Sequence, residues 1–89
     1  MTNSEAVQAV REALELLGPG SHRLATVRDF SSVDGMTMEL ATFKAAIASM
    51  LASGSVVLYP CDYASRVTGE DHLHAVRVRG LEMIYAIAA

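Results

Sequence analysis

The stretch TMELATFKAAIASMLASGSVVLYP, residues 37–60, decides the fold that we predict for this chain. A helix is expected from Thr37 to Ser53, because apolar side chains recur at helical spacing and form one inward stripe: Leu40, Phe43, Ile47, Met50 and Leu51. Thr37 is the expected N-cap of this helix. Gly54 suits the left-handed conformation that commonly follows the last turn of a helix.

Residues 55–89 are predicted to form two strands joined by a long polar excursion. Val56–Tyr59 is a β-rich run, and Pro60 is expected to end it because proline cannot donate to a β ladder. The polar stretch from Cys61 to Leu73 is predicted to be a loop or wing between the strands. The fold prediction rests on this order: the helix at residues 37–53, followed directly by two strands joined by a polar excursion.

The last strand region contains a predicted hairpin. Gly80 and Leu81 fit the centre of a type II′ turn, which places glycine first. The register that follows separates an apolar face from a face that carries arginines, with these opposed pairs: Val78 and Met83, Val76 and Tyr85, Arg79 and Glu82, Arg77 and Ile84.

A first helix is expected near the N-terminus. Thr2 and Glu5 fit a capping box at its start. Its inward stripe has apolar side chains on one face: Val7, Val10, Leu14 and Leu17. The run Gly18-Pro19-Gly20 is expected to end it, because glycine accepts the conformation after a helix and proline cannot continue the hydrogen-bond ladder.

A second, shorter helix is expected from Val27 to Val33, after an extended piece at Ser21–Ala25. Thr26 is its expected N-cap, and Val27 and Phe30 are expected to face inward. The turn signal Asp34-Gly35 should close it.

Composition places the whole chain, residues 1–89, in a single domain. Its 89 residues are 52% apolar, enough for one core and too few for two. The mean hydropathy of +0.30 predicts some uncovered apolar surface and therefore self-association or docking. The net charge of −3 disfavours strong non-specific attraction to a polyanion.

The sequence predicts a soluble, cytoplasmic protein. Cys61 is the single cysteine, so no internal disulfide can form and a reducing compartment is the simpler assumption. The N-terminus has no continuous apolar run of the kind found in signal peptides. No apolar stretch reaches the length of a membrane span, so no membrane partner is expected.

Nothing in the sequence indicates catalysis. Cys61-Asp62-Tyr63 near His72 and His74 is the one cluster with suitable residue types, and it lies in a predicted loop without a glycine-rich anion cradle. Strand spacing would put His72 and His74 on one face, but no second ligand pair completes a tetrahedral zinc site. We therefore expect no enzyme activity, cofactor, metal or small-molecule substrate.

The order helix, extended piece, short helix, longer helix, strand, loop, strand resembles the winged-helix superfamily over nearly the whole chain. The resemblance implies an α+β fold with three helices and a small antiparallel β-sheet with a wing hairpin. It also implies a third helix in the DNA major groove and a hairpin against the phosphates. Carried over by position, the groove-facing residues are Thr42, Lys44, Ala45, Ala48 and Ser49, and the wing contacts are Arg66, Arg77 and Arg79.

The outward side of the third helix leaves two kinds of partner open. Its residues are mostly small, with Lys44 on the border: Glu39, Thr42, Ala45, Ala46, Ala48, Ser49 and Ser53. One hypothesis is a DNA-binding regulator that contacts duplex DNA, with a second copy of the chain as a homodimer partner. The other is a protein-interaction module that docks through this helix or the acidic wing loop, where Tyr63 would be an interface anchor.

Overall fold

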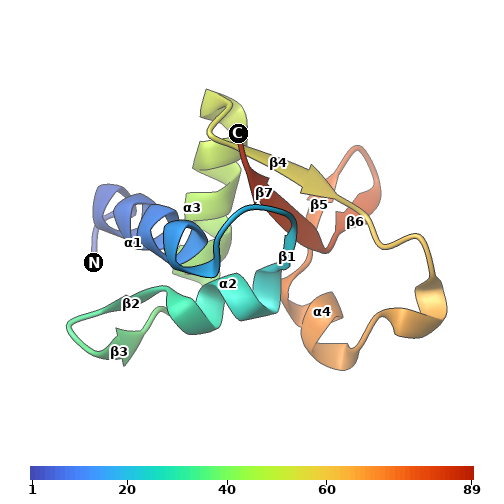
Figure 1. The fold of residues 1–89 in the computed structure, drawn as a ribbon, viewed down its shortest axis with the longest axis horizontal. Coiled ribbons are helices and arrows are strands. Elements are labelled where there is room, and N and C mark those ends of the chain that lie inside the picture. Colours follow the sequence, from blue (N-terminus) through green and yellow to red (C-terminus); the bar gives the residue numbers. More distant parts are fainter.

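A computed structural model describes residues 1–89 as an α+β fold with four α-helices and small antiparallel sheets (Figure 1). The elements follow in this order: α1 (Asn3–Leu17), β1 (His22–Arg23), α2 (Leu24–Phe30), β2 (Ser32–Val33), β3 (Met36–Thr37), α3 (Leu40–Ser53), β4 (Val56–Tyr59), the 3-10 helix η1 (Ala64–Arg66), α4 (Gly69–His74), β5 (Val76–Val78), β6 (Leu81–Met83) and β7 (Tyr85–Ala88). The expected fold class, helices with a small antiparallel sheet, is confirmed at that level. Four helices are present rather than three.

A three-stranded antiparallel sheet in the order β1-β7-β4 places the last strand of the chain between β1 and β4. β4 and β7 are neighbours although residues 60–84 separate them in the sequence, so the excursion is longer than the predicted stretch from Cys61 to Leu73. Alternate residues face opposite sides of the sheet. Val56, Leu58 and Ala86 are therefore buried against the helices, while Val57 and Tyr59 are exposed on the other face.

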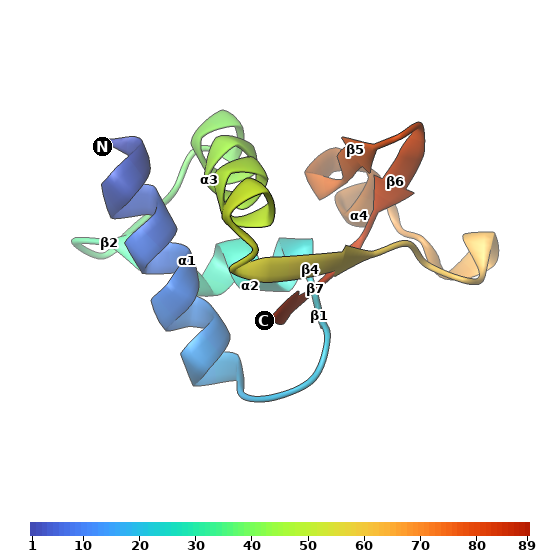
Figure 2. The ribbon, with the colours of Figure 1, turned by 90° about the horizontal axis from the view of Figure 1, so that it is seen from above.

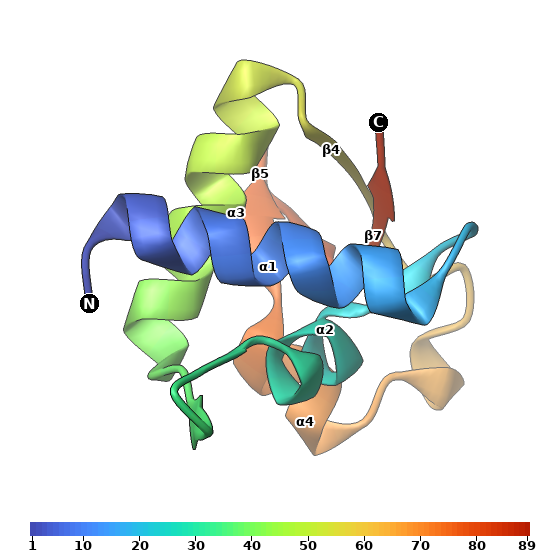
Figure 3. The same ribbon diagram turned by 60° about the vertical axis from the view of Figure 1, so that its left-hand side comes forward.

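The core lies between α1, α2, α3 and the inner face of this sheet. α1 crosses α3 in Figure 3, and the two helices pack against each other. The predicted inward stripes are confirmed. Five of their residues are buried in this core: Val10, Leu14, Phe43, Ile47 and Met50. The remaining stripe residues are partly buried against the same cluster or half-exposed. Ala46 was expected to face outward, and it is fully buried in this core.

Both ends of α1 follow the sequence signals. Thr2 is the N-cap and forms the predicted capping box with Glu5, each side chain accepting from the other residue's backbone N–H. The helix ends at Leu17, and the N–H of Gly18 donates to the carbonyl of Leu14.

The second helix was placed wrongly. α2 begins at Leu24 rather than Val27, because β1 pairs with β7 and leads straight into the helix, where the Leu24 N–H donates to the Ile84 carbonyl at 2.9 Å. Val27 is buried as expected, but Phe30 is half-exposed at the end of the helix.

The Asp34-Gly35 turn closes a small hairpin, β2–β3, and not a helix. Both residues have positive φ, 54° and 77°, the pattern of a type I′ hairpin turn. Thr37 consequently lies in β3 and does not cap α3, which begins at Leu40 after Glu39. Gly54 is in the left-handed conformation at the end of α3, as predicted.

The excursion between β4 and β7 is folded rather than a plain loop. It contains η1, α4 and the β5–β6 hairpin. A local signal opens α4, since Thr68 and Asp71 form a capping box.

The predicted type II′ turn at Gly80-Leu81 is wrong. Arg79 and Gly80 occupy the turn instead, with φ of 53° and 82°, as a type I′ turn requires. The observed pairs are Val76 with Met83, Arg77 with Glu82 and Val78 with Leu81. Each observed partner lies two residues before the predicted one. A shift of two residues does not change the face of a strand residue, so Val76 and Val78 share the predicted face and Arg77 lies on the opposite one. Tyr85 belongs to β7 and pairs with Tyr59.

None of the helices is both long enough and apolar enough to cross a membrane.

Candidate functional site

α3 presents a surface of small residues to solvent. Of the five positions expected to face a DNA groove, Ala45, Ala48 and Ser49 are exposed, and Thr42 and Lys44 are half-buried. The Asn3 amide donates to the Ser49 hydroxyl at 3.0 Å, so the start of α1 engages that residue. Lys44 is the single cation of the helix.

The β5–β6 hairpin carries two exposed arginines, Arg77 and Arg79. The Arg77 guanidinium donates to the Gly80 carbonyl at 3.1 Å, which keeps this side chain near the turn. Glu82, the cross-strand partner of Arg77, accepts from the His72 ring at 3.2 Å, and neither arginine forms an ion pair. Both positive charges are therefore available to a ligand.

α3 and the β5–β6 hairpin project to the same side of the three-stranded sheet, as Figure 2 shows. Arg66 does not join them. Its guanidinium lies over the ring of Tyr63, 5.0 Å from the ring centre, and η1 stands apart from the hairpin tip in Figures 1 and 2. The three wing arginines are thus divided between two places.

The second of these places is a cleft of about 570 Å³ that contains all three tyrosines of the chain. We call it the tyrosine cleft, and its lining residues are Ser21, Tyr59, Pro60, Cys61, Asp62, Tyr63, Arg66, Tyr85 and Ile87. Tyr63 and Arg66 are expected contact residues from the sequence, whereas Tyr59 and Tyr85 are not. The alternation along β4 and β7 was the available signal, because it directs both tyrosines to the outer face of the sheet.

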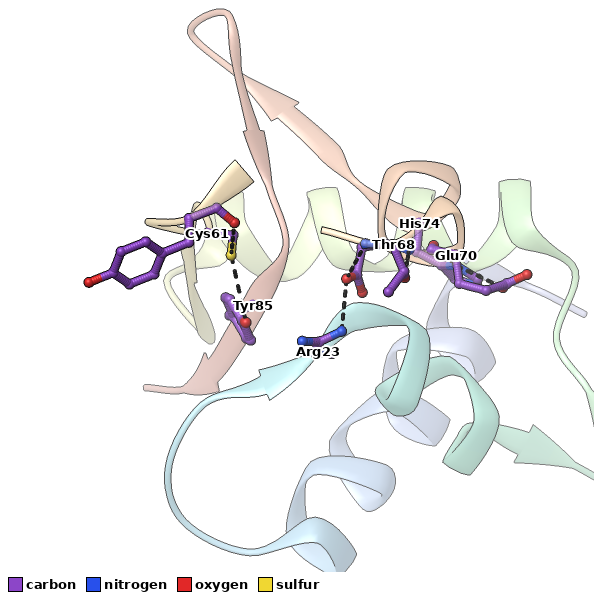
Figure 4. Close-up of polar contacts among 8 residues, drawn as sticks. Arg23, Cys61, Thr68, Glu70, His74 and Tyr85 are labelled. Carbon is purple, nitrogen blue, oxygen red and sulfur yellow. Dashed lines mark hydrogen bonds and ion pairs between the residues drawn. The ribbon is translucent and has the colours of Figure 1, made fainter. Parts of the chain in front are cut away.

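Three contacts connect the residues that form the wall of the tyrosine cleft. The Cys61 thiol donates to the Tyr63 carbonyl at 3.3 Å, and its sulfur lies 3.9 Å from the Tyr85 hydroxyl (Figure 4). Arg23 lies over the Tyr85 ring, 6.0 Å from its centre. The cleft therefore has a defined wall even though Tyr63 comes from a loop.

Arg23 also belongs to a polar network that docks α4 on α2. It donates to the Asp71 carboxylate at 2.9 Å, and Asp71 is only 3% exposed. Figure 4 shows Arg23 beside the start of α4. Buried charges need partners of this kind, and Asp71 has the guanidinium and the Thr68 backbone N–H.

His74 forms the second half of this network. Its Nδ1 lies 2.7 Å from the Glu70 carbonyl, which can only accept, so Nδ1 carries the proton. Nε2 then accepts from the Arg28 guanidinium at 3.2 Å. The ring is buried, meets the Phe43 ring edge-on, and leaves no polar side-chain atom without a partner.

The two histidines do not share a face. They lie in α4 and not in a strand, and positions two apart on a helix point in different directions. His72 is exposed and bonded to Glu82, whereas His74 is buried. No group of three histidine, cysteine or carboxylate side chains gathers in a way that could hold a metal ion.

A second cleft, of about 620 Å³, lies between the end of α1 and residues 88–89. Arg11 lines it and donates to the Ser55 hydroxyl at 3.2 Å. Its lining has no aromatic ring, so the tyrosine cleft is the more distinctive of the two.

Comparison with protein-family models, with curated proteins and with solved structures finds no match for this chain. Function is therefore inferred from two surfaces of the molecule, the side formed by α3 and the β5–β6 hairpin and the tyrosine cleft.

Proposed function

We propose that this protein binds duplex DNA in the manner of winged-helix proteins, with α3 in the major groove and the β5–β6 hairpin against the sugar-phosphate backbone. The observation that supports this most is the projection of α3 and a hairpin with two unpaired arginines to one side of the sheet. In this arrangement Arg77 and Arg79 neutralise phosphates, and phosphate contacts set the position of a protein on DNA.

The shape of α3 favours close approach to a groove. Ala45 and Ala48 are exposed and small, so they leave room for base edges and thymine methyl groups. Lys44 is the one side chain of the helix with a charge that attracts phosphate. With so few polar groups for base edges, we expect modest sequence preference and binding dominated by the backbone.

The element order also supports the proposal. The order α1, β1, α2, α3, β4 and β7 follows the one that suggested the winged-helix resemblance, with the β2–β3 hairpin inserted between α2 and α3 and with η1, α4 and the β5–β6 hairpin between β4 and β7. Fold likeness alone does not establish function, so the charge arrangement remains the main support. A homodimer, in which two copies of α3 meet two half-sites, would fit the same proposal.

The test is a fluorescence anisotropy titration of a random-sequence duplex at low and moderate salt. The wild-type protein should bind at low salt and weaken steeply as salt rises. Each phosphate contact contributes about −0.9 to the slope of log affinity against log salt, so the R77A/R79A double variant should lower its magnitude by about two.

Arg11→Ala is the matched control, because it also removes an exposed guanidinium but lies on α1, away from the hairpin. Its salt slope should equal that of the wild type. Absence of any binding at low salt, or an unchanged slope in the double variant, would contradict the proposal.

A protein partner is the second candidate, because a specific feature of α3 favours it. Its exposed positions offer no arginine, asparagine or glutamine, the side chains that most often pair with base edges. Small residues suit the close packing of another protein surface. Failure to bind DNA at any salt concentration, together with a heterologous complex lost on Ala48→Glu substitution, would favour this candidate over the first.

A further inference from the structure

We propose that the tyrosine cleft binds an extended, proline-rich peptide segment that carries a basic residue beside the prolines. This inference is independent of the DNA proposal, since it concerns the outer face of the sheet and the loop after β4. It identifies the partner by three features of the cleft: its aromatic lining, its preformed wall and its unpaired charges.

The aromatic lining is the first feature. Tyr59 is 48% exposed and Tyr63 is 62% exposed, so their rings present apolar area to solvent beside Pro60. A groove lined by aromatic rings is the usual surface for polyproline II segments, whose proline rings pack on the aromatic rings and which have no internal hydrogen bonds to break. The phenol hydroxyls can donate to the free carbonyls of such a segment.

The wall of the cleft is already formed without a ligand. Tyr59 and Tyr85 are cross-strand partners in the β4–β7 ladder, so their rings lie on the same face of the sheet. Arg23, held by Asp71, supports the Tyr85 ring, and the bond from Cys61 to the Tyr63 carbonyl orients the loop. Binding to a preformed groove costs less ordering entropy, as does the use of a stiff polyproline II ligand.

The charges of the cleft favour a peptide over a nucleic acid as its ligand. Arg66 is stacked on Tyr63, and Asp62 is exposed without an ion pair, so the unpaired charges of the cleft cancel. Single-stranded nucleic acids need aromatic rings together with a positive groove. The cleft instead suits a largely uncharged segment, and because the Arg66 guanidinium already lies over the Tyr63 ring whereas Asp62 has no ion-pair partner, the one charge that it favours in the segment is a lysine or arginine to pair with Asp62.

The chain provides its own reporter for this site. It has three tyrosines and no tryptophan, and all three tyrosines line the cleft. Intrinsic fluorescence therefore reports on the cleft alone. The probe is a short oligoproline peptide with a terminal arginine, compared with a glycine-serine peptide of equal length that has the same arginine and with oligothymidylate.

We expect a saturable fluorescence change with the oligoproline peptide and none with the glycine-serine peptide. Tyr63→Ala should weaken binding about tenfold or more, as expected for an exposed aromatic anchor. Phe30→Ala is the matched control, since it removes an exposed ring from α2 outside the cleft, and it should bind as the wild type does. Asp62→Asn should weaken binding of the arginine-tipped peptide but not of plain oligoproline.

Three results would overturn the inference: no saturable change with the oligoproline peptide, equal affinity of Tyr63→Ala and the wild type, or tighter binding of oligothymidylate. Circular dichroism of the Tyr63→Ala and Phe30→Ala variants should match that of the wild type, because both of these rings are exposed. The R77A/R79A variant should retain peptide binding, which separates the outcome of this experiment from that of the DNA titration.

Discussion

Asp71 is the side chain that most directly fixes the position of α4. Its carboxylate accepts from the Thr68 backbone N–H, which closes the capping box, and from the Arg23 guanidinium of the neighbouring β1. Because it is buried, loss of the carboxylate leaves both donors without their partner.

Replacing Asp71 by Ala should therefore lower the free energy of unfolding by about 2 kcal/mol, the scale of a lost charge-assisted hydrogen bond together with a helix cap. Urea denaturation measures the change. Asp62→Ala is the control, since Asp62 is exposed and unpaired, and it should stay within about 0.5 kcal/mol of the wild type. Equal stability of the two variants would contradict this role for Asp71.

Phe43 and Phe30 give a matched pair for the core. Phe43 is fully buried between the helices and touches the His74 ring, whereas Phe30 is 50% exposed. Phe43→Ala should destabilise the protein by about 3–5 kcal/mol, because it removes a large buried side chain and leaves a cavity. Phe30→Ala should cost about 1 kcal/mol or less by the same denaturation measurement. A near-neutral Phe43→Ala would show that α3 has been oriented wrongly.

At the scale of elements, the start of α1 should respond to pH. The Thr2 backbone N–H, which donates to the carboxylate, and then the Thr2 side chain lower the pKa of Glu5 below its ordinary value. A carboxyl whose pKa is lower in the folded state contributes stability above its unfolded pKa and loses it as pH falls through the folded pKa. The first turn of α1 should therefore fray in acid.

Amide hydrogen exchange of the first turn of α1 checks this prediction. Glu5→Gln should reduce protection near neutral pH and should converge with the wild type at acidic pH. Glu12→Gln is the control, as Glu12 is exposed in the middle of the same helix. A difference between Glu5→Gln and the wild type that persists unchanged in acid would contradict the capping role.

Local signals predicted the elements best where the chain alone determines them. The capping box at Thr2, the end of α1 at Gly18 and the left-handed Gly54 depend on residues within one helical turn. The start of α2 depends instead on a bond from Leu24 to Ile84, sixty positions along the chain, which no local pattern reveals.

Turn chemistry explains the remaining differences at this scale. Gly80 suits either a type II′ turn, as its first central residue, or a type I′ turn, as its second. The structure uses the second, and Arg79 accepts a positive φ that is uncommon for a residue with a side chain. The missed α4 has a capping box with aspartate, Asp71, in the place where glutamate or glutamine is usual.

At the scale of the whole molecule, the candidate sites depend on contacts that join distant parts of the chain. Tyr59 and Tyr85 meet because β4 pairs with β7 across the excursion. The sequence predicts an exposed loop for Tyr63 and Arg66, and the structure shows that both line the same cleft as Tyr59 and Tyr85. The separation of Arg66 from Arg77 and Arg79 likewise follows from the folding of η1 and α4, which sequence analysis treated as loop.

The central claim, that α3 and the β5–β6 hairpin together form a DNA-binding surface, is tested most directly by amide chemical-shift mapping with a short random-sequence duplex. We predict shifts that lie together on one side of the molecule, at Ala45, Ala48, Arg77 and Arg79, and that fade as salt is added. Shifts confined to the tyrosine cleft, or no shifts at low salt, would contradict the claim.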